Sequence, residues 1–147
     1  MDVYDFLKKR CDYGSIEQIN THLHNIVGVD NFFLSKSDYE GFLDFIQKDD
    51  AVDFTKGREW GDIQTPKKLT DKICLTVKNT LNFEPDIILE PTYGIGNFII
   101  SSIEIFPNLK KIYGVEINKE FAWWFKRSLL EKFLNTNKKL PKICLYT

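Results

Sequence analysis

A carboxylate and two glycines follow a short apolar run in the middle of the chain. The run Ile87–Leu89 ends in Glu90, and Gly94 and Gly96 come soon after it. A short, fully apolar run is typical of a buried parallel strand. Glycines permit backbone angles and close contacts that a Cβ would block. The sequence therefore predicts a ligand site at a strand end, where a turn opens a helix.

The charge of Glu90 discriminates between ligands. A dinucleotide site places a pyrophosphate over such a turn, near the helix N-terminus, and a carboxylate there would repel it. Ile99 also occupies the third glycine position of G-x-G-x-x-G, and the chain has no G-x-x-x-x-G-K-[ST] phosphate loop. We expect instead a ligand with a cationic amine and a sulfonium, which Glu90 would stabilise. The alternative is that Glu90 only caps the following turn.

A second acid, Glu116, follows Gly96 by 20 residues, at the end of the next apolar run. An acid in this position accepts the two ribose hydroxyls of an adenosine in related nucleotide folds. Ile117, beside it, is placed to lie against the adenine. The alternative is an ordinary exposed glutamate next to a helix cap.

Three stretches resemble motifs of DNA methyltransferases that methylate amino groups and use S-adenosylmethionine. IILEPTYGIGNF (Ile87–Phe98) resembles their cofactor motif, and YGVEIN (Tyr113–Asn118) resembles their second motif. REWGDIQTPKKLTDKI (Arg58–Ile73) resembles their Gly-x-x-x-Thr-Pro segment. The order is that of the adenine-modifying branch of the restriction–modification type, and the resemblance covers about Arg58–Phe125. It implies these cofactor contacts: Thr65 and Pro66 at the methionine; Glu90, Thr92, Gly94, Gly96 and Asn97 around the amino-acid part; Glu116 and Ile117 at the adenosine.

One motif of that family is missing. Its members carry an Asn/Asp/Ser-Pro-Pro-Tyr/Phe loop, which holds the target amine and stacks on a flipped-out base. The five prolines of this chain include no adjacent pair. We therefore expect an N-terminal fragment of the methyltransferase domain, with no catalytic residues and no activity of its own. DNA is the expected partner of the full-length protein, with weak or no binding by this chain alone. The absent strands would leave an unpaired sheet edge through which the chain could self-associate.

Two alternatives remain open. Tyr93 and Ile95 are bulkier than the small residues usual in the cofactor motif, which would suit a non-catalytic protein-interaction module on a methyltransferase-like fold. A fragment of a protein or RNA methyltransferase is the other alternative.

Local patterns predict the elements that would hold this site. Residues 1–50 read as three short helices, with Ser15 and Ser37 in capping-box spacing, and 49–64 read as a loop. Thr65 as N-cap and Pro66 as first helical residue open a helix to about Leu81. Strands follow near 87–89, 111–117 and 143–146, with helices between them. This order predicts an α/β, partial Rossmann-like fold with about three parallel strands, divided into a helical region (1–57) and a truncated methyltransferase domain (58–147).

Composition narrows the function further. The 147 residues are 43% hydrophobic, include 12 Phe, and have a net charge of -1, which argues against a strongly cationic nucleic-acid binder. The lysine clusters at 67–72 and 138–142 are expected to be solvated faces. Three scattered cysteines and two histidines predict neither a disulfide framework nor a metal site. No apolar run approaches the roughly 18 residues that cross a bilayer, so we expect a cytoplasmic protein.

Overall fold

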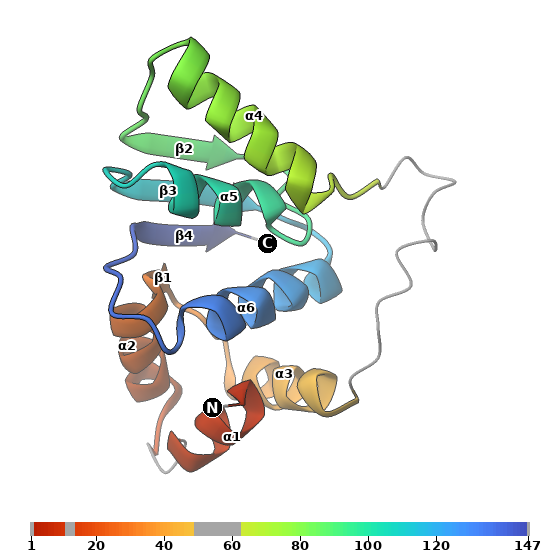
Figure 1. The fold of residues 1–147 in the computed structure, drawn as a ribbon. Helices are drawn as coiled ribbons and strands as arrows, with labels where there is room; N and C mark the ends of the chain where they lie inside the picture. The colour runs from red at the N-terminus through yellow and green to blue at the C-terminus, as the bar shows by residue number, and fades with distance from the viewer. Residues whose placement is uncertain (1, 11–13, 49–62, 147) are drawn as a thin grey trace.

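The structure, a computed structural model, describes residues 2–10, 14–48 and 63–146. In these ranges a single parallel sheet is packed against helices (Figure 1). Its strand order is β1-β4-β3-β2, and every pairing is parallel. The predicted α/β class and partial Rossmann-like fold are confirmed. The strands are β1 (Val29–Asp30), β2 (Ile87–Glu90), β3 (Lys111–Val115) and β4 (Lys142–Tyr146).

The strand β1 was not predicted. It lies in the region expected to be only helical and pairs with β4, with Val29 opposite Ile143. Gly28, in the left-handed conformation at φ 74°, ends the preceding helix and turns the chain into the sheet. The Ile143 N–H then donates to the Gly28 carbonyl at 2.8 Å. This pairing joins the N-terminal region of the chain to the sheet.

Among the described residues, three helices after residue 66 lie beside the sheet, and three more lie before residue 49 (Figure 1). Phe125 and Leu129 of α6 (Lys119–Phe133) are fully buried and belong to the same core as the sheet residues Ile112 and Ile143. The three short N-terminal helices are confirmed. The helices are α1 (Val3–Arg10), α2 (Ile16–Val27), α3 (Lys36–Lys48), α4 (Lys67–Thr80), α5 (Asn97–Ile105) and α6 (Lys119–Phe133).

Two helix starts differ from the prediction by one or two residues. The Pro66 carbonyl accepts the first helical bonds of α4, from Leu69 and Thr70, so Pro66 is the N-cap and Thr65 precedes it. In α3 the cap is formed by Ser35 rather than Ser37, because the Ser35 hydroxyl accepts from the Asp38 N–H at 3.1 Å. The predicted cap at Ser15 is confirmed, since its side chain accepts from Gln18.

A buried charge joins the N-terminal helices to α6. Asp38 is 6% exposed and accepts hydrogen bonds from the Leu34 N–H (3.1 Å) and the Trp123 indole (3.0 Å). The ammonium of Lys126, also buried, lies 3.9 Å from the same carboxylate. Burial lowers the pKa of Lys126, and the nearby Asp38 opposes that shift. This cluster holds α3 against α6.

The β2 edge of the sheet has no neighbouring strand in the described residues. Ile87 and Leu89 point away from the helical layer and are 59% and 67% exposed. Parallel sheets are normally covered on both faces, so this is an unusual exposure of apolar surface. The prediction that this strand is buried is therefore wrong for these two side chains. Among the helices described, none is long and apolar enough to cross a membrane.

Candidate functional site

The carboxyl ends of β2 and β3 border a hollow of about 470 Å³. Ligands bind at this end of the strands in open α/β sheets. Six of the nine residues expected at the cofactor line the hollow. They are Thr65, Glu90, Thr92, Gly94, Asn97 and Glu116.

The other three expected residues lie nearby but outside the lining. Pro66 caps α4 on the surface. Gly96 is buried beneath the turn. Ile117 follows β3 with its side chain 90% exposed, beside Glu116.

The turn after β2 is built around two positive backbone angles. Gly94 has φ 53° and Gly96 has φ 80°, values that favour glycine. The Gly96 N–H donates to the Tyr93 carbonyl at 2.7 Å, which closes the turn just before α5 begins. The Tyr93 N–H donates to the Val115 carbonyl at 3.1 Å and so extends the ladder between β2 and β3.

The space beside each glycine is filled by the protein itself. A Cβ on Gly94 would stand 2.0 Å from the side-chain oxygen of Gln64. A Cβ on Gly96 would stand 1.9 Å from the ring of Phe125. Both distances are too short for real contacts. At Gly96 the neighbour is a buried ring, so this position requires glycine for packing as well as for backbone angle. At Gly94 the neighbour is the end of a flexible side chain, so the backbone angle is the main requirement. The sequence predicted that a ligand approaches these glycines closely. In the structure, the side chains of Gln64 and Phe125 lie against them.

Glu116 is held by two backbone donors. One carboxylate oxygen accepts from the Gly94 N–H at 2.8 Å and the other from the Asn118 N–H at 2.7 Å. The Ile95 N–H donates to the Gln64 side chain at 3.0 Å. Every N–H from Tyr93 to Gly96 therefore has an acceptor inside the protein. A phosphate would have to displace these acceptors before it could bind the turn.

The carboxyl group of Glu90 lies at the tip of β2 and lines the hollow. Burial raises its pKa, and a hydrogen bond from the Thr92 backbone partly opposes the shift. A carboxylate whose charge is poorly solvated gains most when a cation approaches it. The hollow is thus better suited to a positively charged ligand group than to an anion.

The bulk of Tyr93 is directed into the core. Its side chain is 5% exposed, and its ring packs on Phe125 with 5.2 Å between centroids. Gly114 on β3 makes room for it, since a Cβ there would lie 2.8 Å from the Tyr93 ring. The Tyr93 hydroxyl is buried and has no hydrogen-bond partner in the described part of the chain. Burial raises the pKa of this hydroxyl, and the charge of Glu116 raises it further.

Buried hydroxyls join α4 to α5, and an amide beside them holds the segment that precedes α4. Thr70 and Ser101, both fully buried, are hydrogen-bonded to each other at 2.7 Å across α4 and α5. Ser101 also donates to Asp71 at 2.8 Å. Beside them, the Asn97 amide donates to the Thr65 carbonyl at 2.8 Å. Residues 64 and 65 are thereby held against the start of α5.

Sequence reasoning missed part of this lining. Four further residues line the hollow and were not expected there: Ile63, Gln64, Tyr93 and Phe98. Gln64 directly precedes the Thr-Pro pair, which was the available signal. Arg58–Asp62, including Trp60, lie outside the described residues.

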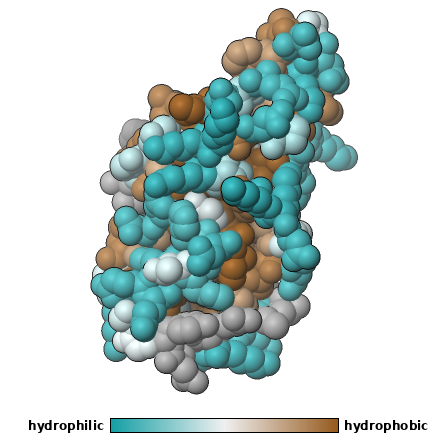
Figure 2. All heavy atoms as spheres, turned by 90° about the vertical axis from the view of Figure 1, so that its left-hand side faces the viewer, coloured by the Kyte–Doolittle hydropathy of each residue, from teal (hydrophilic) through white to brown (hydrophobic). Residues whose placement is uncertain are grey.

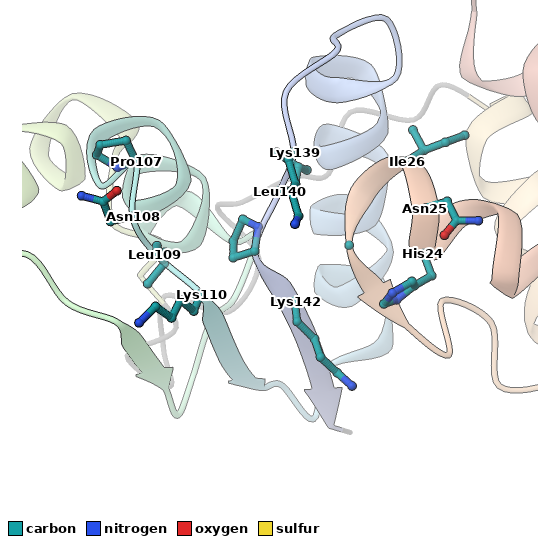
Figure 3. A pocket seen from close by; sticks show the side chains of 12 residues that line it. His24, Asn25, Ile26, Pro107, Asn108, Leu109, Lys110, Lys139, Leu140 and Lys142 are labelled. Carbon is teal, nitrogen blue, oxygen red and sulfur yellow. The ribbon is translucent and has the colours of Figure 1, made fainter.

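A larger hollow, of about 650 Å³, lies at the opposite, amino ends of the strands. Figure 2 shows this end, where hydrophilic side chains surround a small hydrophobic area. The lining comes from the end of α2 and from the loops before β3 and β4 (Figure 3). Its lysines are already partnered in part, Lys110 with Asp86 and Lys142 with Asp30, each at 2.9 Å. The described ranges contain no group of three or more His, Cys, Asp or Glu residues able to hold a metal ion.

Comparison with curated proteins adds a relative. Over 80 residues the chain is 44% identical to the "Type II methyltransferase M.NspV" of Nostoc sp.. In that stretch, the chain is similar to a type II methyltransferase. The match covers 54% of this chain and 16% of the relative, so the chain spans only a small part of that enzyme's length. No family model and no solved structure matches the chain. The similarity supports the methyltransferase resemblance that the three motifs indicated.

Proposed function

We propose that this chain is the S-adenosylmethionine-binding part of a DNA adenine methyltransferase of the restriction–modification type. In the full-length protein the reaction would methylate the exocyclic amine of adenine. The observation that carries the proposal is the half-buried Glu90 carboxylate at a strand tip, above a turn whose N–H groups are already paired. The type II methyltransferase relative supports the same reaction class.

The residues around the hollow fit such a cofactor. Glu90 would pair with its ammonium group, and Thr65 and Asn97 would contact its methionine end. Glu116 retains lone pairs for ribose hydroxyls, since each oxygen accepts a single backbone N–H in the described structure. Ile117, with an exposed side chain, would cover the adenine. Pro66 caps α4 and Gly96 allows the turn before α5, so both would position the segments that carry these side chains. Thr92 would lie beside the cofactor, because it lines the hollow.

When bound, S-adenosylmethionine supplies a methyl group already activated as a sulfonium. The chain's own part is to bind and orient that group and to keep phosphates out. The Pro-Pro-aromatic loop that would hold the adenine amine is not in this sequence. We therefore expect no methyl transfer to DNA by this chain alone, and little DNA affinity at a net charge of -1.

The adenine assignment rests on motif order. The Thr-Pro segment precedes the cofactor strand, as in the adenine-modifying branch that the sequence resembles. The alternative of a protein-interaction module drew its support from the bulk of Tyr93 and Ile95. The Tyr93 ring packs on Phe125 in the core, and Ile95 does not line the hollow, so neither side chain fills it. A fragment of a protein or RNA methyltransferase remains the competing enzyme class, and the motif order favours it less.

Isothermal titration calorimetry with S-adenosylmethionine and S-adenosylhomocysteine tests the proposal. We expect saturable binding by the chain, weakened in Glu90→Ala and Glu116→Ala, because each change removes one charged partner of the cofactor. Glu40→Ala, on an exposed face of α3, is the matched control and should bind as the wild type does. An absence of heat at millimolar ligand would refute cofactor binding and favour the interaction module.

A further inference from the structure

Gln64 reaches across the glycine turn from the segment before α4. Its side-chain oxygen accepts the Ile95 N–H at 3.0 Å. It also occupies the place where a Cβ on Gly94 would stand. Only the oxygen of the Gln64 side-chain amide can accept the Ile95 N–H, so this hydrogen bond fixes which end of the amide faces the turn.

The backbone at Gln64 is anchored independently of that contact. The next residue, Thr65, accepts a hydrogen bond from the Asn97 side chain at 2.8 Å. Two ties therefore join residues 64 and 65 to the turn and to the first residue of α5. On the other side of the turn, Glu116 holds the Gly94 N–H at 2.8 Å. Two successive amides of the turn are therefore held by different side chains: Glu116 accepts the Gly94 N–H, and Gln64 accepts the Ile95 N–H.

We propose that Gln64 is a positioning residue that holds the Gly94–Ile95 turn in its ligand-accepting shape. Glu116 cannot do this alone, because in this turn it accepts only the Gly94 N–H and leaves the Ile95 N–H to another acceptor. Gln64 is that acceptor. This inference rests on the proposed cofactor function, and it concerns a residue that the motif resemblance does not assign.

The test compares four proteins: wild type, Gln64→Ala, Gln64→Glu and Gln47→Ala. Gln64→Glu keeps an oxygen that can accept the Ile95 N–H. Gln47→Ala is the matched control, because that glutamine also makes a side-chain hydrogen bond, to Tyr4 at 2.6 Å, but on exposed α3. Two quantities are measured: the hydrogen-exchange rate of the Ile95 amide without ligand, and the Kd for S-adenosylhomocysteine.

We expect Gln64→Ala to speed exchange at Ile95 and to raise the Kd roughly fivefold, the effect of losing one net hydrogen bond. Gln64→Glu should restore both quantities toward the wild type, and Gln47→Ala should change neither. Unchanged exchange at Ile95 in Gln64→Ala would overturn the inference, as would a failure of Gln64→Glu to rescue. If the wild type did not bind the cofactor, the proposed function would fail, and the exchange data would still decide the role of Gln64.

Discussion

The packing of Gly96 against Phe125 gives a quantitative prediction. In Gly96→Ala the new Cβ would lie 1.9 Å from a ring carbon of Phe125, which is fully buried. The ring cannot move aside without disturbing Tyr93, which packs against it. We expect two costs to add: about 1–2 kcal/mol for a side chain at φ 80°, and about 1–3 kcal/mol for overpacking the core. The expected loss of folding stability is therefore about 2–5 kcal/mol.

Two other glycines provide the comparison. Gly94→Ala has the backbone cost at φ 53°, but its new atom meets the flexible end of Gln64, which can turn away. A Cβ on Gly14 has nothing within 4 Å, so Gly14→Ala should change stability by no more than about 0.5 kcal/mol. The expected order of destabilisation is Gly96, then Gly94, then Gly14.

Urea unfolding followed by circular dichroism measures these differences through the transition midpoint. A 2–5 kcal/mol loss is a large part of the roughly 5–15 kcal/mol that stabilises a typical domain, so the Gly96→Ala shift should be evident. If Gly96→Ala unfolded at the same urea concentration as Gly14→Ala, the packing account of the turn would be wrong.

Three further predictions follow from charge and exposure. Burial raises the pKa of Glu90, so ionisation of this carboxyl group destabilises the folded state. Glu90→Gln should therefore be more stable than the wild type near neutral pH. This advantage should vanish as the pH falls below the ordinary pKa of 4.5. Equal stability at neutral pH would contradict it. Asp38→Ala leaves buried Lys126 without its acid and should cost about 3–5 kcal/mol in urea unfolding, whereas Asp38→Asn should cost less because it keeps acceptors. Self-association through the β2 edge should weaken in Leu89→Lys. It should persist in Leu34→Lys, the matched control, because the two leucines are similarly exposed (67% and 68%) and only Leu89 lies on β2. A wild-type chain that stays monomeric in light scattering would exclude this self-association.

Several features of the site were predictable because their signals are local. An apolar run followed by an acid predicted the strand and the place of Glu90 at its end. Asn is a preferred N-cap residue, and the Asn118 side chain accepts from the Glu120 and Phe121 N–H groups at the start of α6. The carboxylate of Glu116 was expected at the next strand end. Each of these depends on a few consecutive residues, whose propensities and hydrogen bonds act over one turn of chain.

The tertiary structure decided the contacts between distant segments. The two-residue strand β1 carries no periodic pattern, and only its pairing with β4 defines it. Gly94 and Gly96 signalled a tight turn, but the sequence could not say that Gln64 and Phe125 fill the space beside them. Nor could it show that Gly114 opens room for Tyr93. Such contacts depend on how whole helices and strands pack, because the energy of a close fit belongs to both partners and neither local sequence encodes it alone.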